Sequence, residues 1–421
     1  MSLDRNIRKL SINILDNVFL KGKNLKTEYE TVSANLSSRD SSFLKFSVYG
    51  IVRIKRSLDD VISRLYLGNF YKINETNKNI LRLGLFQIEF MNSVPNYAAV
   101  NTAVEIAKQR GVKFSKTVNA ILNRFIRENK KIRINSSLHN YSHSILDSFK
   151  SDYTEKEVKN LCDWYERIPF IWLRIENSKD RKLIFKIYQS KTITFGNNLD
   201  YLRIKKLDTQ IRKFIKSRSL TVQSPGSGLV VRLLNVHKNE TVIDACAAPG
   251  GKSRHLLQLI DNPRLLMLND FNQQRYIKMK EDFDLYDTKF SCKDSSEDTF
   301  SFFDKILLDV PCSSSGTISK NPDIKWKKID FDELSLLQSK ILQNMSSSLK
   351  SGGALVYSTC SILEKENFRV VRNFLDLNRN FKIDNASKYI DNQFVDSNGC
   401  INIFPPKYKL EGVFAVRLIK I

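Results

Sequence analysis

The chain has 421 residues, of which 42% are hydrophobic, and a formal net charge of +23 at pH 7. This length predicts two or three domains with hydrophobic cores of their own. The sequence has no apolar run near the ~18–20 residues of a membrane span and no secretory segment. Its six cysteines are scattered, which argues against a disulfide framework or a cysteine zinc site. We expect a cytoplasmic monomer without a metal.

The positive charge is concentrated in the first part of the chain. The net charge is +13 for residues 1–150, +8 for residues 151–240 and +2 for residues 241–421. A long basic surface is typical of a protein that binds a polyanion, so we expect nucleic acid as a partner. A lysine-rich surface that only keeps the protein dissolved is the alternative, and no helix with a clean basic face indicates a membrane.

Residues 1–140 are predicted to form a helical domain. Apolar residues recur at helical spacing from Ile7 to Val18, and a long apolar helix is stopped by Pro95. Residues 141–235 differ, because strand-like and helical runs alternate there. We expect a small α+β segment with strands at FIWLRI, KTITF and LTVQ and helices at DRKLIFKIYQ and QIRKFIKS.

From residue 236 onward, short apolar strands alternate with helices. The predicted strands include TVIDA, RLLML, KILLDV and GGALVYST. This alternation is typical of a parallel sheet covered by helices on both faces. We therefore expect a multidomain chain: an all-α domain at 1–140, a small α+β segment at 141–235 and an α/β Rossmann-like domain at 236–421.

A glycine-containing loop joins the first of these strands to its helix. The loop consists of Cys246, Ala247, Ala248, Pro249, Gly250, Gly251 and Lys252. Such a turn lets a ligand approach the backbone at a helix N-terminus, near the switch point of strand order. It is neither the dinucleotide motif GxGxxG nor the phosphate loop GxxxxGKS/T, so an ordinary tight turn between strand and helix is the alternative.

Acidic residues follow three strands of this region. Asp270 comes after RLLML, Asp294 comes after KFSCK, and Asp309 ends KILLD. One carboxylate at a strand end is unremarkable, but three at the edge that carries the glycine loop describe an adenosine pocket. The absence of GxGxxG favours S-adenosylmethionine over a nicotinamide cofactor.

Two strands end in a small residue followed by a cysteine, at Pro311-Cys312 and Thr359-Cys360. If these are neighbouring parallel strands, ~4.8 Å apart, both thiols face one cavity. Methylation of pyrimidine carbon 5 demands such a thiol, because a thiolate must first add to carbon 6. A carboxyl group near ring N3, here Asp309, can stabilise the charge that develops on the ring. The alternative is that both cysteines are small buried hydrophobes.

Three segments closely resemble signature motifs of the Nol1/Nop2/Sun RNA cytosine-C5 methyltransferases: DACAAPGGKSRHL, DVPCSSSGTISKNPDIKW and YSTCSILEKEN. The closing strand of that family is similar to EGVFAVRLIK, and its NusB-like RNA-binding domain is similar to the helical region from LRLGLFQIEF to VNAILNRFIREN. The combination resembles the bacterial Sun branch, the ribosomal RNA small subunit methyltransferase B group.

The resemblance implies a role for each site residue. Cys360 is the nucleophile, Cys312 assists release of the methylated RNA, and Asp309 contacts the target base. The residues implied to bind S-adenosylmethionine are 246–252, Asp270, Asp294 and Asp309. The implied partner is 16S ribosomal RNA, free or in an assembling small subunit, and neither DNA nor a membrane is expected.

Two positions depart from the family pattern. Gln223 is followed by Ser224, where the family usually has an aspartate, so any contact made there is in doubt. After the second strand, an ungapped alignment puts Asn269 at the acidic position. We place that role on Asp270, because DFNQQR then matches the family pattern at the cost of one inserted residue.

The sequence therefore predicts an enzyme that makes 5-methylcytosine in 16S ribosomal RNA through a covalent adduct between cysteine and cytosine. A DNA cytosine-C5 methyltransferase is one alternative, but such enzymes use the cysteine of the PC motif as nucleophile and have a different glycine loop. A non-catalytic RNA-binding factor of ribosome assembly is the other. The presence of both thiols and all three carboxylates argues against it.

Overall fold

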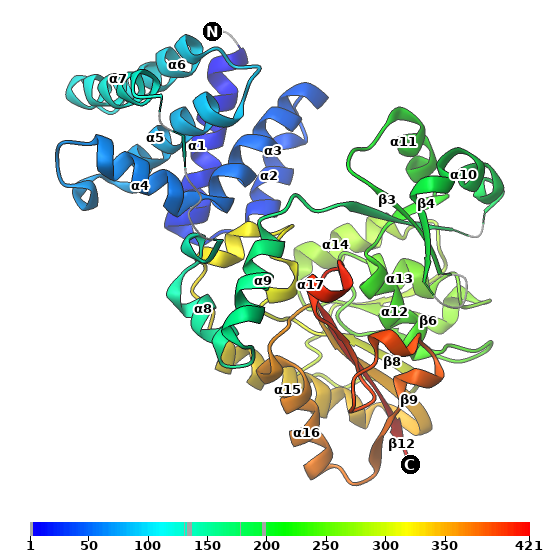
Figure 1. Cartoon of the computed structure of the whole chain (residues 1–421). Helices are drawn as coiled ribbons and strands as arrows, with labels where there is room; N and C mark the ends of the chain where they lie inside the picture. The colour runs from blue at the N-terminus through cyan, green and yellow to red at the C-terminus, as the bar shows by residue number, and fades with distance from the viewer. Residues whose placement is uncertain (1–2, 130, 133–136, 177, 196–198) are drawn as a thin grey trace. The chain divides into compact units, whose positions relative to one another are not determined.

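The computed structural model describes residues 3–129, 131–132, 137–176, 178–195 and 199–421. The chain folds into two compact units (Figure 1). One unit consists of Met1–Arg167 and Ile318–Lys328, and the other consists of Ile168–Thr317 and Ile329–Ile421. Within the described ranges, every helix is too short or too polar to cross a bilayer.

The first unit is helical. Its described helices are α1 (Leu3–Lys21), α2 (Leu25–Ser33), α3 (Ser38–Arg53), α4 (Lys55–Leu65), α5 (Glu75–Phe90), α6 (Asn96–Lys108), α7 (Val112–Arg127), α8 (His143–Lys150) and α9 (Glu155–Tyr165). Helix α5 is central, because it packs against α1, α3, α4, α6 and α7. Gly84 permits the close approach of α7, since a Cβ there would lie 2.7 Å from Leu122 Cδ1.

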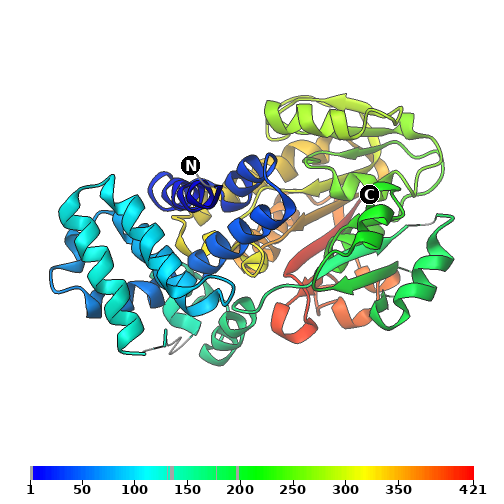
Figure 2. The same cartoon turned by 90° about the horizontal axis from the view of Figure 1, so that it is seen from above.

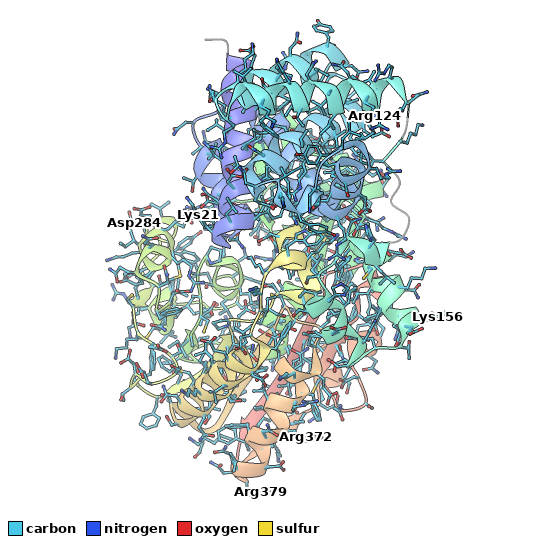
Figure 3. The ribbon with its side chains drawn as sticks, turned by 90° about the vertical axis from the view of Figure 1, so that its left-hand side faces the viewer. Lys21, Arg124, Lys156, Asp284, Arg372 and Arg379 are labelled. Atoms are coloured by element: carbon cyan, nitrogen blue, oxygen red, sulfur yellow. The ribbon has the colours of Figure 1, made fainter. Side chains whose placement is uncertain are left out.

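Basic side chains lie on the surface of this unit. Lys21 on α1 and Lys156 on α9 are exposed (Figure 3). Arg110, Lys113 and Lys116 are exposed around the start of α7. These side chains are part of the positive excess that the sequence places in the first 240 residues.

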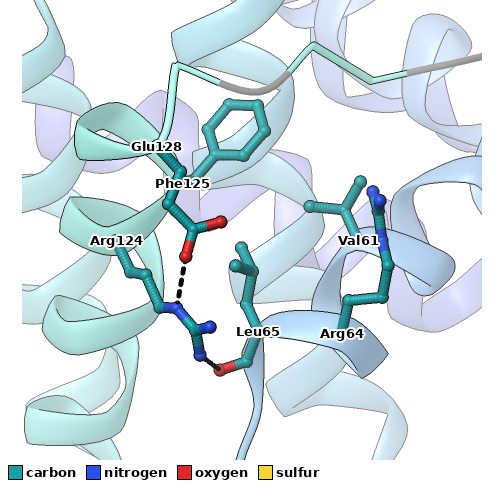
Figure 4. A pocket seen from close by; sticks show the side chains of 6 residues that line it. All are labelled: Val61, Arg64, Leu65, Arg124, Phe125 and Glu128. Carbon is teal, nitrogen blue, oxygen red and sulfur yellow. Dashed lines mark hydrogen bonds and ion pairs between the residues drawn. The ribbon is translucent and has the colours of Figure 1, made fainter.

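Figure 4 shows how α7 is joined to the end of α4. Arg124 donates hydrogen bonds to the Glu128 carboxylate at 2.7 Å and to the Leu65 carbonyl oxygen at 3.4 Å. The same side chains, with Val61, Arg64 and Phe125, line a small pocket. This basic side chain therefore has a structural task within the unit.

Residues 318–328 belong to the first unit although they lie far along the chain. Trp326 packs against the helical core, and its Nε1 donates to the Val52 carbonyl oxygen at 2.7 Å. Lys325 is fully buried, where it forms an ion pair with Glu166 and lies 4.3 Å from the centre of the Tyr141 ring. The polar and aromatic contacts of this segment therefore complete the unit.

The second unit contains two sheets. Its helices are α10 (Arg181–Tyr188), α11 (Thr209–Lys216), α12 (Pro225–Leu234), α13 (Gly251–Leu256), α14 (Gln273–Asp282), α15 (Phe331–Ser347), α16 (Phe368–Leu377) and α17 (Pro405–Tyr408). Its strands are β1 (Ile171–Ile175), β2 (Thr192–Phe195), β3 (Leu199–Ile204), β4 (Leu220–Val222), β5 (Val242–Asp244), β6 (Leu266–Asn269), β7 (Lys289–Ser291), β8 (Phe303–Asp309), β9 (Leu349–Thr359), β10 (Phe381–Asp384), β11 (Ile401–Ile403) and β12 (Val413–Lys420).

The smaller sheet is antiparallel, with strand order β2-β3-β1-β4. The larger sheet has the order β10-β12-β9-β8-β5-β6-β7, and β11 pairs with β12. Strands β5 to β9 are parallel, whereas β12 runs antiparallel to β9. This order confirms the sequence prediction that β8 and β9 are neighbours.

Helices cover both faces of the larger sheet (Figures 1 and 2). On one face, Leu307 and Val356 pack in a core with α12, α13 and α14. On the other face, Leu308 and Tyr357 pack in a core with α15 and α16. Because successive residues of a strand point to opposite faces, the continuous apolar runs of β8 and β9 fill both cores.

The predicted fold class is confirmed: a helical domain, a small α+β segment and a Rossmann-like sheet domain occur in that order. The division at residues 140 and 235 stays a prediction. Strand β3 was missed, since its polar residues obscure the alternation. Asp200 is buried there because it accepts a hydrogen bond from Thr194 and pairs with Arg181, and such partners are invisible in a local pattern.

Candidate active site

The two thiols predicted from the sequence lie side by side. Strand β8 leads into the loop of Cys312, and Cys360 follows β9 directly. The Sγ atoms are 3.3 Å apart. The Gly316 N–H donates to the Cys360 carbonyl oxygen at 2.9 Å, so the two loops are also joined through their backbones.

The surroundings shift the pKa values of the two thiols in opposite directions. The hydrogen bond from the Cys312 thiol lowers the pKa of Cys360, and Ser314 Oγ at 3.3 Å and the Lys252 charge act in the same direction. The same hydrogen bond, together with burial and the Glu366 charge, holds the pKa of Cys312 well above its usual range. The arrangement therefore favours a thiolate at Cys360 and a thiol at Cys312.

Asp309 ends β8 beside these thiols and binds the last residue of the glycine loop. Lys252 Nζ donates to Asp309 Oδ2 at 2.6 Å, and Ser358 Oγ donates to Asp309 Oδ1 at 3.0 Å. Although burial opposes it, this ion pair raises the pKa of Lys252. A fixed cation thus lies next to the carboxylate predicted to contact the target base, and the pairing was not foreseen from the sequence.

The glycine loop packs against the end of β6. Ala247 N donates to the Asn269 carbonyl oxygen at 2.8 Å, and Gly250 adopts a positive φ of 96°. At Gly251 a Cβ would meet nothing within 4 Å, so this backbone faces open space. Cys246 lies in the same loop, and burial raises the pKa of its thiol.

The carboxyl group of Asp270 contacts the loop, whereas the side chain of Asn269 does not. Asp270 Oδ2 accepts from Ala248 N at 3.2 Å, and its Oδ1 accepts from Asn272 N at 3.0 Å. The Asn269 amide is fully buried and bonded to Ala245, Ser291, Lys293 and Ser295. Asn269 therefore has a structural role, and the placement of the acidic role on Asp270 stays a prediction.

Two further carboxylates, Asp294 and Asp244, differ in their hydrogen-bond partners. Asp294 Oδ1 accepts from Ser296 N at 2.8 Å and from Ser296 Oγ at 2.6 Å, which holds the turn after β7. Asp244 at the end of β5 was missed by the sequence analysis, although it opens the quoted DACAAPGGK motif. Burial raises its pKa from 3.8 to about 7. Its Oδ2 accepts from Ser253, and its Oδ1 has no partner within the described residues.

The position that departs from the family pattern has a local explanation. Ser224 begins α12, where its side chain accepts from Ser227 N at 3.4 Å and acts as the N-cap. Gln223 reaches the glycine loop instead, since its Nε2 donates to the Gly251 carbonyl oxygen at 3.0 Å. Arg174 from β1 donates to the Gln223 side chain at 2.7 Å. A serine at residue 224 therefore keeps a capping function.

The loop and its acids fit a cationic nucleoside ligand. Such a ligand offers ribose hydroxyls and an ammonium group as donors, and the partnerless Asp244 oxygen and the carboxylates of Asp270 and Asp309 are acceptors at the same edge. The open backbone at Gly251 leaves room for it. Within the described residues no group of three metal-ligating side chains occurs.

Comparison with known proteins finds two families that match different parts of the chain. The family model for the 16S rRNA methyltransferase RsmB/F matches residues 231–419, and the model for the NusB family matches residues 5–127. Residues 231–419 therefore match the RsmB/F methyltransferases and residues 5–127 match the NusB family. The resemblance inferred from the motifs is confirmed.

Relatives of this family cover nearly the whole chain. The probable ribosomal RNA small subunit methyltransferase B of Synechocystis is 29% identical over 91% of this chain and 92% of its own length. The ribosomal RNA small subunit methyltransferase B of Cronobacter sakazakii is 28% identical over 99% of both. The crystal structure of PH0851 has a TM-score of 0.78 at 20% identity, covers 98% of this chain and 99% of that chain, and shows the same fold.

Proposed function

We propose that the protein methylates carbon 5 of a cytosine in 16S ribosomal RNA through a covalent bond between Cys360 and carbon 6. The observation that carries this proposal is the pair of sulfurs 3.3 Å apart with a lowered pKa at Cys360 and a raised pKa at Cys312. A reaction that needs only a nucleophile would need only one of these thiols. A reaction that forms a covalent adduct and then releases it needs two groups with different tasks.

The proposed reaction begins at Cys360. Its thiolate attacks carbon 6 of the cytosine, and the electron pair displaced toward carbon 5 makes that carbon a nucleophile. S-adenosylmethionine, held by residues 246–252 with Asp244, Asp270 and Asp294, supplies the methyl group. A base then takes the proton from carbon 5, the electron pair of that bond re-forms the carbon 5–carbon 6 double bond, and Cys360 departs as thiolate. We assign Cys312 to this release step.

Asp309 and Lys252 are proposed to act on the base. The carboxyl group of Asp309 is assigned to the N3 side of the ring, where charge develops during the attack. Lys252 stays bonded to Asp309 at 2.6 Å and orients it. The lysine charge also favours the thiolate of Cys360, so one cation supports both groups.

The RNA substrate is proposed from the names of the relatives and from the charge of the chain. Both curated relatives are named as small subunit methyltransferases. The excess of basic residues before residue 241 suits binding along an RNA backbone. Within this proposal the helical unit binds RNA and the sheet unit carries out the chemistry.

The test is an assay with S-adenosylmethionine labelled in its methyl group, 16S ribosomal RNA and duplex DNA. Transfer to RNA, with 5-methylcytosine as the only labelled nucleoside after digestion, is the expected result. Label in DNA would favour a DNA methyltransferase. Binding of RNA without transfer, under conditions where cofactor binds, would favour a non-catalytic assembly factor.

A further inference from the structure

One buried carboxylate touches both thiol loops. Glu366 lies on the short 3-10 helix Glu364–Glu366 and is fully buried. Its carboxylate accepts from Ser313 N at 2.7 Å and from Ser313 Oγ at 2.5 Å, and it also accepts from Ser361 Oγ. Ser313 directly follows Cys312, and Ser361 directly follows Cys360. The carboxylate therefore bonds to the residue next to each thiol.

A glutamine and a third serine extend this network. Gln338 from α15 donates to the Glu366 carboxylate at 3.1 Å and to the carbonyl oxygen of Pro311, the residue before Cys312, at 2.9 Å. Ser315 Oγ lies 3.0 Å from Ser361 Oγ. The two loops are thus joined by these side chains and by the Gly316–Cys360 backbone bond.

Glu366 is a buried carboxylate without a cationic partner among the described residues, which is unusual for a side chain that only fills a core. In the part of the chain that the structure describes, no lysine, arginine or histidine lies within ion-pair distance of it, and its partners are neutral donors. Burying an unpaired carboxylate is costly unless several hydrogen bonds compensate. The carboxylate accepts four hydrogen bonds, three from the two loops and one from Gln338, so its removal would take an acceptor from each of these donors.

We propose that Glu366 is a positioning residue that locks the Cys312 loop to the Cys360 loop and so fixes the separation of the two sulfurs. It does not touch the RNA or the methyl donor and acts through Ser313 and Ser361. Its importance for catalysis rests on the two-thiol reaction proposed above. Its geometric part can be tested without RNA.

The test measures how tightly the full-length protein binds phenylarsine oxide, which bonds to two thiols with loss of one water when they lie close together. Glu366→Ala should weaken this binding by about 10- to 100-fold, because the sulfurs are no longer held at one distance. Glu366→Gln should restore most of it, since the amide can accept from Ser313 N and donate to the two hydroxyls. Glu333→Gln on the exposed start of α15 is the matched control, and Cys312→Ala identifies binding that needs both thiols.

Three outcomes decide the proposal. A folded Glu366→Ala variant with wild-type affinity for the arsenical would overturn it. If that variant does not fold, Ser313→Ala combined with Ser361→Ala removes two of the donors, and unchanged affinity there would overturn it equally. Weak binding by Glu366→Ala together with nearly normal binding by Glu366→Gln, or weak binding by the double serine variant, supports it.

A second measurement separates this proposal from the proposed function. Covalent capture of RNA that carries 5-fluorocytosine, from which no proton can leave carbon 5, reports the attack of Cys360. A wild-type protein that binds the arsenical but captures no RNA would contradict the two-thiol reaction and leave the positioning role standing. A Glu366→Ala variant that captures RNA at the wild-type rate and binds the arsenical normally would contradict the positioning role alone.

Discussion

The Sγ atoms of Cys312 and Cys360 lie 3.3 Å apart although 48 residues separate the two cysteines in the chain. The pairing of β8 with β9 brings them together, because parallel neighbours end at the same edge of the sheet. The resulting hydrogen bond makes them unequal: it lowers the pKa of Cys360 and raises that of Cys312. Substitutions of the two cysteines should therefore have different effects.

Cys360→Ala should form no covalent adduct with RNA and no product, because carbon 6 loses its nucleophile. Cys312→Ala should still attack and methylate but then stall, so that a protein–RNA species accumulates. Denaturing electrophoresis with labelled RNA and labelled methyl donor distinguishes the two results. Cys292→Ala, at an exposed cysteine after β7, is the control and should behave as wild type.

The reverse result would change the mechanism. An adduct trapped by Cys360→Ala and absent from Cys312→Ala would exchange the two roles, as in the DNA-type reaction. Normal methylation by both variants would make the cysteines packing residues.

Asp270→Ala should weaken binding of S-adenosylmethionine, because a ribose hydroxyl loses its acceptor, at a cost of about 1–3 kcal/mol. Asn269→Ala should instead lower the stability of the fold, since its side chain is fully buried and bonded to four neighbours. Calorimetric titration and thermal unfolding of both variants separate the effects. Weaker cofactor binding in a stable Asn269→Ala protein than in Asp270→Ala would show that the acidic role has been misplaced.

The buried Asp244 should make the free energy of unfolding depend on pH. Burial raises its pKa from 3.8 to about 7, so the folded chain keeps a proton that the unfolded chain releases in this range. The stabilisation from this proton is complete below pH 3.8 and is lost as the pH rises to about 7.

Asp244→Asn should remove this dependence and raise the free energy of unfolding at pH 8 by about 2–4 kcal/mol. The same substitution should weaken cofactor binding. Urea unfolding at pH 5 and pH 8 checks the first effect, with the exposed Asp282→Asn as control. An Asp244→Asn variant that is less stable than wild type at pH 8 would contradict the expectation.

The helical unit should supply much of the RNA affinity through phosphate contacts. Replacing Arg110, Lys113 and Lys116 together by glutamine should weaken RNA binding and reduce the slope of log affinity against log salt by roughly 2. Their charges are exposed around the start of α7. Filter binding over a range of salt concentrations measures the slope.

The matched control for this experiment lies in the sheet unit. Arg372 and Arg379 are exposed on and just after α16 (Figure 3), and Lys382 is exposed on β10. Their replacement by glutamine removes the same charge and should leave the salt slope nearly unchanged. An equal loss from both triple variants would mean that net charge, and not this helical surface, governs binding.

The buried ion pair of Lys325 and Glu166 should matter most when only one partner is removed. Lys325→Met should destabilise the protein by about 3–5 kcal/mol, because Glu166 is left as an uncompensated buried charge. Adding Glu166→Gln should recover much of the loss. Chemical unfolding of the wild type, Lys325→Met and the double variant tests this. Equal free energies of unfolding for the three proteins would show that the ion pair is dispensable.

The sequence predicted most of the features that depend on local pattern or chain order. The alternation of strands and helices after residue 236 gave the parallel sheet, and strand ends gave Cys312, Cys360 and Asp309. Strands and helices can be predicted in this way because apolar periodicity is a local pattern. Residues at the ends of neighbouring parallel strands can then be placed at one edge of the sheet.

The features that escaped prediction depend on partners far along the chain. Glu366 meets Ser313 across 53 residues, Lys252 meets Asp309 across 57, and Lys325 meets Glu166 across 159. A buried charged residue looks like a surface residue until its partner is known. For the same reason the sequence analysis assigned residues 318–328 to the α/β domain at 236–421.

The course of that segment has a consequence for synthesis of the protein on the ribosome. Because Ile318–Lys328 completes the unit that begins at Met1, this unit cannot finish folding when its first 167 residues have emerged. The contacts of Trp326 with Val52 and of Lys325 with Arg53 and Glu166 can form only after residues 325 and 326 have been synthesised. At roughly 5–20 residues per second, the earlier helices lack these contacts for roughly 8–30 seconds, and they gain them only after the loop of Cys312 has been synthesised.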